Sequence, residues 1–143
     1  MSEFSRNMAF VIGINNYTNG ISPLHNAEND AKQLVELLRK QHGYQVWVCL
    51  NELATLNKLN RFLSHTLPEQ VQENDRLLFY FAGHGIALNG DDGPAGYLIP
   101  QDATLNATET YLPMAKLQES LEKLPCRHFL GILDCCFAGA FRW

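Results

Sequence analysis

The chain has 143 residues, 46% of them hydrophobic and 18% charged, a composition typical of one globular domain. Its formal net charge is −4 and it has no cluster of lysine and arginine, which argues against a nucleic-acid partner. The longest apolar run, Met8–Ile14, is far too short to span a bilayer. Four cysteines without a secretory pattern argue against a disulfide framework, so the expected compartment is the cytoplasm.

The first half of the chain alternates strand and helix patterns. The apolar run Met8–Ile14 has no helical period and predicts a strand buried on both faces. Residues 26–41 predict a helix, and His42-Gly43 supplies its stop signal. Residues 44–50 predict a second strand, and Thr55 is a suitable N-cap for a second helix. The apolar positions that share one face of these helices are Ala27, Ala31, Leu34, Val35 and Leu38 in the first, and Leu56, Leu59, Leu63 and Leu67 in the second.

The second half continues the alternation. Residues 75–82 predict a third strand, the polar stretch 83–96 a long loop, and residues 97–100 a short extended piece. Pro113 fits the first turn of a third helix, and residues 127–134 predict a fourth strand. Four strands alternating with three helices predict an α/β fold, a doubly wound and mostly parallel sheet with helices on both faces. In such sheets function gathers at the carboxyl ends of the strands.

Two of the predicted strands end in residues that carry chemistry. The third is followed by Gly83-His84-Gly85, and the fourth ends at Asp134, followed by Cys135-Cys136 and a small-residue turn. Carboxyl ends of parallel strands lie at one edge of a sheet, so a histidine and a cysteine are expected to converge there. A thiol beside an imidazole is a nucleophile with its base.

These motifs resemble the caspase-like cysteine peptidases, and most closely the metacaspase and bacterial orthocaspase branch. The resemblance covers nearly the whole chain and includes Gly13-Ile14-Asn15, Asn29-Asp30-Ala31 and Ile99-Pro100-x-Asp102. It implies a catalytic His84 and a nucleophilic Cys136, while Cys135 falls where serine is common. It also implies an oxyanion hole built from the backbone N–H groups of Gly85 and Cys136, and hydrolysis of peptide bonds through a thioacyl-enzyme.

The resemblance also bears on specificity and cofactors. Asp30 and Asp134 match the two acids that line the S1 pocket of metacaspases, which implies cleavage after arginine or lysine. Phe137-Ala138 departs from the common His-Ser or Phe-Ser after the nucleophile. The acidic insertion of calcium-dependent metacaspases is reduced here to Asp91-Asp92, which argues against calcium activation without excluding it, and no other metal or cofactor is expected.

Simpler structural interpretations compete with each of these roles. His84 could be a turn histidine and Cys136 a buried structural thiol. Asp30 could stabilise the start of its helix, and Asp134 could cap the turn that follows it. Metal binding by Cys135 and Cys136 with His84 has the wrong spacing for a usual zinc site.

At the level of the protein, the leading hypothesis is an endopeptidase, and the alternative is a catalytically silent interaction or scaffold module of the same fold. A phosphate-binding domain would need a glycine-rich loop after the first strand, and a serine hydrolase would need a G-x-S-x-G elbow. Neither motif is present.

The resemblance finally implies that residues 1–143 are the large-subunit portion of a caspase-like catalytic domain. Such domains continue with further strands, often in a separate small subunit. Without them the fourth strand is an edge, apolar on both faces and prone to pair with another chain. The expected partners are therefore a protein or peptide substrate, and a small-subunit chain or C-terminal continuation along the last strand.

Overall fold

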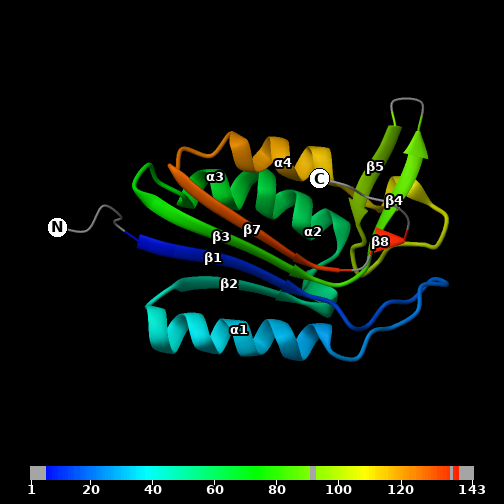
Figure 1. Ribbon diagram of the computed structural model, residues 1–143, viewed down its shortest axis with the longest axis horizontal. Helices are drawn as coiled ribbons and strands as arrows, with labels where there is room; N and C mark the ends of the chain where they lie inside the picture. Colours follow the sequence, from blue (N-terminus) through cyan, green and yellow to red (C-terminus); the bar gives the residue numbers. More distant parts are fainter. Residues whose placement is uncertain (1–5, 91–92, 136, 139–143) are drawn as a thin grey trace.

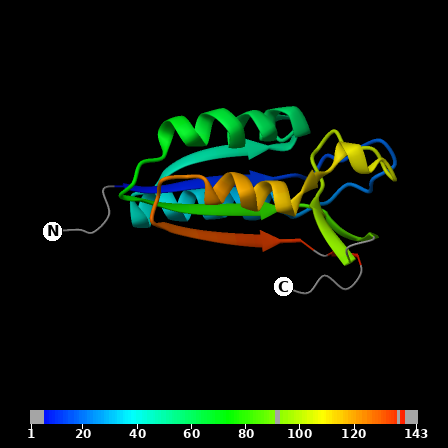
Figure 2. The ribbon, with the colours of Figure 1, turned by 90° about the horizontal axis from the view of Figure 1, so that it is seen from above.

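A computed structural model of the chain describes residues 6–90, 93–135 and 137–138. Its main sheet has four parallel strands in the order β2-β1-β3-β7 (Figure 2). They are β1 (Arg6–Gly13), β2 (Gln45–Leu50), β3 (Asp75–Ala82) and β7 (His128–Asp134). The strand order turns back at β1, as doubly wound topology requires, and helices cover both faces (Figure 1). The predicted α/β fold class is confirmed.

The helix α1 (Ala27–His42) covers one face of the sheet. Its buried side chains are Ala27, Ala31, Val35 and Leu38, as its sequence pattern predicts. It ends at Gly43, whose φ of 63° is the left-handed conformation that glycine adopts without a steric cost. The N–H of Gly43 donates to the carbonyl of Leu38, which closes the last turn.

The opposite face is covered by α2 (Leu56–Arg61), α3 (Leu67–Gln70) and α4 (Met114–Glu122) (Figure 1). A π-helical segment, η2 (Phe62–Thr66), joins α2 to α3, so the predicted second helix is continuous but contains a wide turn. Thr55 caps it as predicted, because its side chain accepts a hydrogen bond of 3.4 Å from the N–H of Lys58. Pro113 lies just before α4 rather than in its first turn.

The core lies on both faces of the central strands. In β1 the last six residues are buried, and alternate side chains pack toward α1 or toward the α2–α4 layer. The larger cluster, on the α2–α4 side, holds Phe10, Phe79 and Phe81. At the far end of the same strands Arg6 forms two hydrogen bonds with the buried carboxylate of Asp75, at 2.7 and 3.0 Å.

The predicted long polar loop after β3 is wrong. Residues 85–90 and 93–98 instead form an antiparallel pair of strands, β4 (Gly85–Gly90) and β5 (Gly93–Leu98). Together with β6 (Leu112–Pro113) and β8 (Phe137–Ala138) they make a second, small sheet in the order β6-β5-β4-β8. The segment is rich in glycine, which is rare in strands, but ladder hydrogen bonds are formed by the backbone and need no side chain. The remaining short elements are two 3₁₀ turns, η1 (Asn51–Leu53) and η3 (Thr108–Thr110).

Strand β7 is the edge of the main sheet in the described part of the chain (Figure 2). It differs from β1 and β3 because most of its side chains are exposed. Phe129 is 48%, Leu130 60% and Ile132 40% exposed. None of the described helices is long and apolar enough to cross a membrane.

Candidate active site

The carboxyl ends of β1, β3 and β7 are tied together by backbone hydrogen bonds. The N–H of Ile14 donates to the carbonyl of Ala82 at 3.0 Å, and that of Gly83 donates to the carbonyl of Asp134 at 3.4 Å. His84 follows directly, and β4 begins at Gly85. The histidine therefore lies at the junction between the main sheet and the small sheet, where the topology predicts function.

The backbone of His84 is held on both sides. Its N–H donates to the hydroxyl oxygen of Tyr17 at 2.9 Å, and its carbonyl accepts from the N–H of Ile99 at 3.0 Å. The Tyr17 hydroxyl in turn donates to the carbonyl of Ile99 at 2.9 Å. These three bonds fix the position from which the imidazole projects.

The imidazole of His84 is held as well. Its Nε2 lies 2.8 Å from the carbonyl oxygen of Ser22, in the loop between β1 and α1. A carbonyl oxygen only accepts hydrogen bonds, so Nε2 carries a proton in this arrangement. In the neutral ring Nδ1 is then the acceptor, available to take a proton from a thiol. The sequence shows no acid for this histidine, and the partner is a main-chain group instead.

The nucleophile proposed from the sequence, Cys136, lies outside the described residues, but its neighbours on both sides are described. Cys135 is half-buried and packs against the core cluster on the α2–α4 side, which agrees with a packing role. Phe137 begins β8, which runs parallel to β4 with Phe137 opposite Gly85. The residue after the expected nucleophile is thus paired with the residue after the expected base.

Two of the predicted acids lie around a tyrosine. The hydroxyl of Tyr80, on the α1 face of β3, donates to Oδ2 of Asp134 at 3.2 Å. Burial, the charge and hydrogen bond of Asp134, and the charge of Asp30 together raise the pKa of Tyr80 to about 12. Asp30 lies in the first turn of α1. The structure therefore brings Asp30 and Asp134 near the same tyrosine: Tyr80 is hydrogen-bonded to Asp134, and the charge of Asp30 also acts on it.

The loop between β1 and α1 is itself anchored by Asn51. The buried side chain of Asn51 accepts hydrogen bonds from the N–H groups of Asn15 and Asn16, at 2.9 and 3.1 Å. Asn15 accepts one from the N–H of Glu28 at 3.0 Å, which links the loop to the first turn of α1. Asn51 adopts a φ of 50°, a conformation in which asparagine is enriched.

Four residues of this site were not predicted from the sequence: Tyr17, Ser22, Asn51 and Tyr80. Ser22 acts through its carbonyl, so its side chain carries no signal. Tyr17 belongs to the Gly-Ile-Asn-Asn-Tyr stretch at the end of the first strand, and Tyr80 interrupts the apolar run 77–82 of the third strand. A hydroxyl in a buried strand or loop needs a partner, and this is the one signal that the sequence offers for them.

The other cysteines and Asp102 have structural surroundings. Burial raises the pKa of the Cys49 thiol to about 11 and also raises the pKa of Cys126, so both are poor nucleophiles at neutral pH. Asp102 accepts a hydrogen bond of 2.9 Å from the N–H of Leu56 at the start of α2, which is a structural role. Asp91 and Asp92 lie outside the described residues. Among the residues that are described, no three histidine, cysteine or acidic side chains are grouped to hold a metal.

A comparison with known families identifies the domain. The sequence model of the caspase domain matches residues 6–142. The chain belongs to the caspase-domain family of peptidases. In this caspase domain the match extends from the first residue of β1 to beyond β8, so it includes both His84 and Cys136.

Solved structures show the same fold. The caspase domain is similar to protein GSU0716 from Geobacter sulfurreducens, with a TM-score of 0.76 and 20% sequence identity. The similarity covers 95% of this chain but 52% of GSU0716, so the caspase domain described here spans about half the length of that protein. No curated protein matches the chain significantly.

Proposed function

We propose that the chain is a cysteine endopeptidase of the metacaspase and orthocaspase branch, with Cys136 as nucleophile and His84 as general acid and base. The observation that carries the proposal is the pairing of Gly85 with Phe137, within a chain that matches the caspase domain. This register joins the two segments that contain the dyad. The hydrogen bond from Nε2 of His84 to the Ser22 carbonyl supports it, because it leaves Nδ1 as the acceptor.

In the proposed reaction the Cys136 thiol transfers its proton to His84, and the thiolate attacks the carbonyl carbon of the substrate. The backbone N–H groups of Gly85 and Cys136 stabilise the negative oxygen that forms. The C–N bond then breaks, and His84 gives its proton to the departing amine, which leaves a thioester on Cys136. Water hydrolyses the thioester with His84 as base, which releases the acid and restores the thiol.

We also propose that the residue on the amino side of the cleaved bond is arginine or lysine. Asp134 is oriented by the Tyr80 hydroxyl, and the charge of Asp30 acts on the same tyrosine. Two carboxylates at one place attract a cation, and arginine can bind them in a bidentate manner. The observed Tyr80–Asp134 hydrogen bond favours a defined orientation of the carboxylate over a purely solvated one.

The decisive experiment compares three variants on peptide substrates with arginine at the cleavage site. We expect Cys136→Ala and His84→Ala each to lower kcat/KM by roughly 10³-fold or more. Cys135→Ala is the matched control, one residue away, and should keep most of the activity. A peptidyl electrophile that ends in arginine should label wild type at Cys136.

If Cys135→Ala is the inactive variant, the nucleophile has been assigned to the wrong cysteine. If wild type, tested together with the small-subunit portion expected along its last strand, neither turns over peptides nor accepts the label, the chain is an interaction module of the same fold.

A further inference from the structure

The hydroxyl of Tyr17 occupies a position that no motif of the sequence predicts. It accepts a hydrogen bond of 2.9 Å from the N–H of His84 and donates one of 2.9 Å to the carbonyl of Ile99. The side chain is buried, with 4% of its surface exposed. The Tyr17 hydroxyl therefore connects the backbone of His84 to the backbone of Ile99.

The ring of Tyr17 also lies beside the imidazole. The two ring centroids are 4.7 Å apart, with the planes inclined at 52°. The neighbour Gly83 makes this approach possible, because a Cβ at that position would come within 2.6 Å of the Tyr17 hydroxyl oxygen. The side chain of Tyr17 thus contacts both the backbone and the imidazole ring of His84.

The loop that carries Tyr17 also carries Ser22, the carbonyl partner of the imidazole. Asn51 anchors the start of this loop through the N–H groups of Asn15 and Asn16. The backbone N–H of Tyr17 adds a bond of 3.0 Å to the carbonyl of Asn15. This loop therefore supplies two of the contacts that position His84, and Ile99 supplies a third through the His84 carbonyl.

We propose that Tyr17 is a positioning residue that fixes the place and orientation of His84, an inference that rests on the proposed catalytic role of that histidine. Tyr17 touches neither the substrate nor the reacting thiol in this role. It acts by holding the backbone of residue 84 and one side of its ring. Transfer of a proton depends strongly on this geometry, because a displacement of about 1 Å can reduce a rate by on the order of 10²-fold.

The chemistry of the phenol suits this role. Burial raises the pKa of Tyr17 above its ordinary value; the hydrogen bond from His84 acts in the opposite direction, and negative charge on Cys135 would raise it. The hydroxyl therefore keeps its proton over the physiological pH range. Its bond to the Ile99 carbonyl needs that proton, so the bridge is constant where the enzyme works.

The test compares Tyr17→Phe with the matched control Tyr111→Phe in the full protein. Tyr111 is also buried, and its hydroxyl accepts a backbone hydrogen bond of 3.0 Å from Asn106, in the loop around η3. Both variants lose a buried hydroxyl, so both should lower the Tm by a few degrees. Only Tyr17→Phe should lower kcat, by on the order of 10²-fold, with KM nearly unchanged.

A second readout does not depend on turnover. Long-range ¹H–¹⁵N spectra of the histidine rings report which nitrogen of His84 is protonated. We expect the Nε2–H form in wild type and in Tyr111→Phe, and a shifted or mixed spectrum in Tyr17→Phe. If Tyr17→Phe does not fold, Gly83→Ala replaces it, because its Cβ would come within 2.6 Å of the same hydroxyl oxygen, and within 2.9 Å of the Phe81 ring.

An unchanged His84 spectrum in Tyr17→Phe overturns the proposal, and so does an equal change in Tyr111→Phe. A changed spectrum with an unchanged kcat overturns it as well. If wild type shows no turnover even with the small-subunit portion present, the proposed function has failed, and the spectra alone still decide whether Tyr17 positions His84.

Discussion

The hydrogen bond between Tyr80 and Asp134 shows how a single polar residue in an apolar strand shapes the end of the sheet. Tyr80 lies on the α1 face of β3, opposite Ile132 in the register with β7. From there its hydroxyl reaches Asp134, which follows two positions later on β7. A phenylalanine would fill the same space and leave the carboxylate without this partner. The ring of Tyr80 therefore packs in the core on the α1 side, while its hydroxyl orients Asp134 of the proposed S1 pocket.

The proposed pocket predicts a specific loss of activity. Asp134→Asn and Asp30→Asn should each lower kcat/KM for cleavage after arginine by a factor of tens, because hydrogen bonds to charged groups contribute about 1.5–3 kcal/mol. Glu28→Gln is the matched control, since Glu28 shares the first turn of α1 with Asp30 but pairs with Lys32. Steady-state kinetics on peptides that differ at one residue would measure the effect. Efficient cleavage after aspartate would contradict the assignment.

Tyr80 also predicts how stability depends on pH. Its pKa is about 12 in the folded chain, against 10.0 for an ordinary tyrosine, so the folded state keeps a proton that the unfolded state loses. The stabilisation that the protonated Tyr80 adds to the folded state is complete below pH 10 and is lost as the pH rises toward 12. Between pH 10 and 12 the free energy of unfolding should fall by about 2 kcal/mol more in wild type than in Tyr80→Phe. Urea titrations at several alkaline pH values would measure the free energy of unfolding of both proteins. The same pH dependence in wild type and in Tyr80→Phe would contradict the prediction.

At the scale of elements, the sequence predicted what depends on hydrophobic periodicity. Strand β3 has the predicted bounds, β1 and β2 begin or end within two residues of them, and α1 buries the predicted face. The two motifs at the ends of β3 and β7 lead to a common edge because parallel topology leaves no other arrangement. These features follow from local pattern plus one topological rule.

The small sheet was missed for a physical reason. Its strands β4 and β5 are stabilised by backbone pairing across Gly85, Ala87, Gly90 and their partners, and small residues give no alternating pattern. The partners of His84 were missed for a related reason. They are a main-chain carbonyl and a hydroxyl that lies far away in the sequence, so only the folded chain brings them together.

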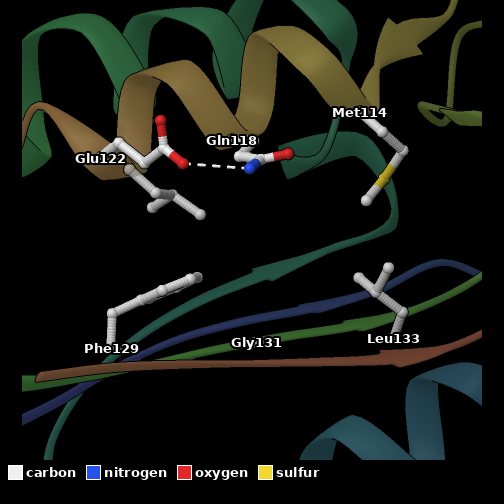
Figure 3. Close-up of a pocket in the computed structure, with 7 residues that line it drawn as sticks. Met114, Gln118, Glu122, Phe129, Gly131 and Leu133 are labelled. Atoms are coloured by element: carbon white, nitrogen blue, oxygen red, sulfur yellow. Dashed lines mark hydrogen bonds between the residues drawn. The ribbon is translucent and has the colours of Figure 1, made fainter. Parts of the chain in front are cut away.

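At the scale of the whole molecule, β7 is the edge strand of the main sheet among the described residues, and it has exposed apolar side chains. On the α1 side Leu130 and Ile132 are exposed. On the other side a groove of about 520 Å³ separates β7 from α4 (Figure 3). Phe129 and Leu133 point into it from the strand and Met114 from the helix, while Gln118 and Glu122 of α4 are joined by a hydrogen bond of 3.0 Å. Large apolar side chains on both faces of an edge strand are typical of a strand that continues a sheet.

We propose that β7 pairs with a strand from the small-subunit portion of a caspase-like domain, either a continuation of the chain or a separate polypeptide. The groove beside α4 would receive apolar side chains from the same partner. The similarity to GSU0716 supports this proposal, because about half of that protein extends beyond the matched region. Backbone hydrogen bonds along an edge strand do not depend on sequence, so another strand, including one from a second copy of the chain, can pair with β7 when the partner is absent.

This proposal predicts the behaviour of residues 1–143 expressed alone. Without its partner strand, β7 should pair with a second copy, so the sedimentation coefficient should rise with protein concentration and peptide hydrolysis should be weak. Leu130→Lys should reduce the association, because a lysine on an edge strand opposes pairing. Leu53→Lys is the matched control, since Leu53 is 55% exposed and lies away from the edge, against 60% for Leu130. A monomer at all concentrations with full activity and rapidly exchanging β7 amides would show that this edge needs no partner.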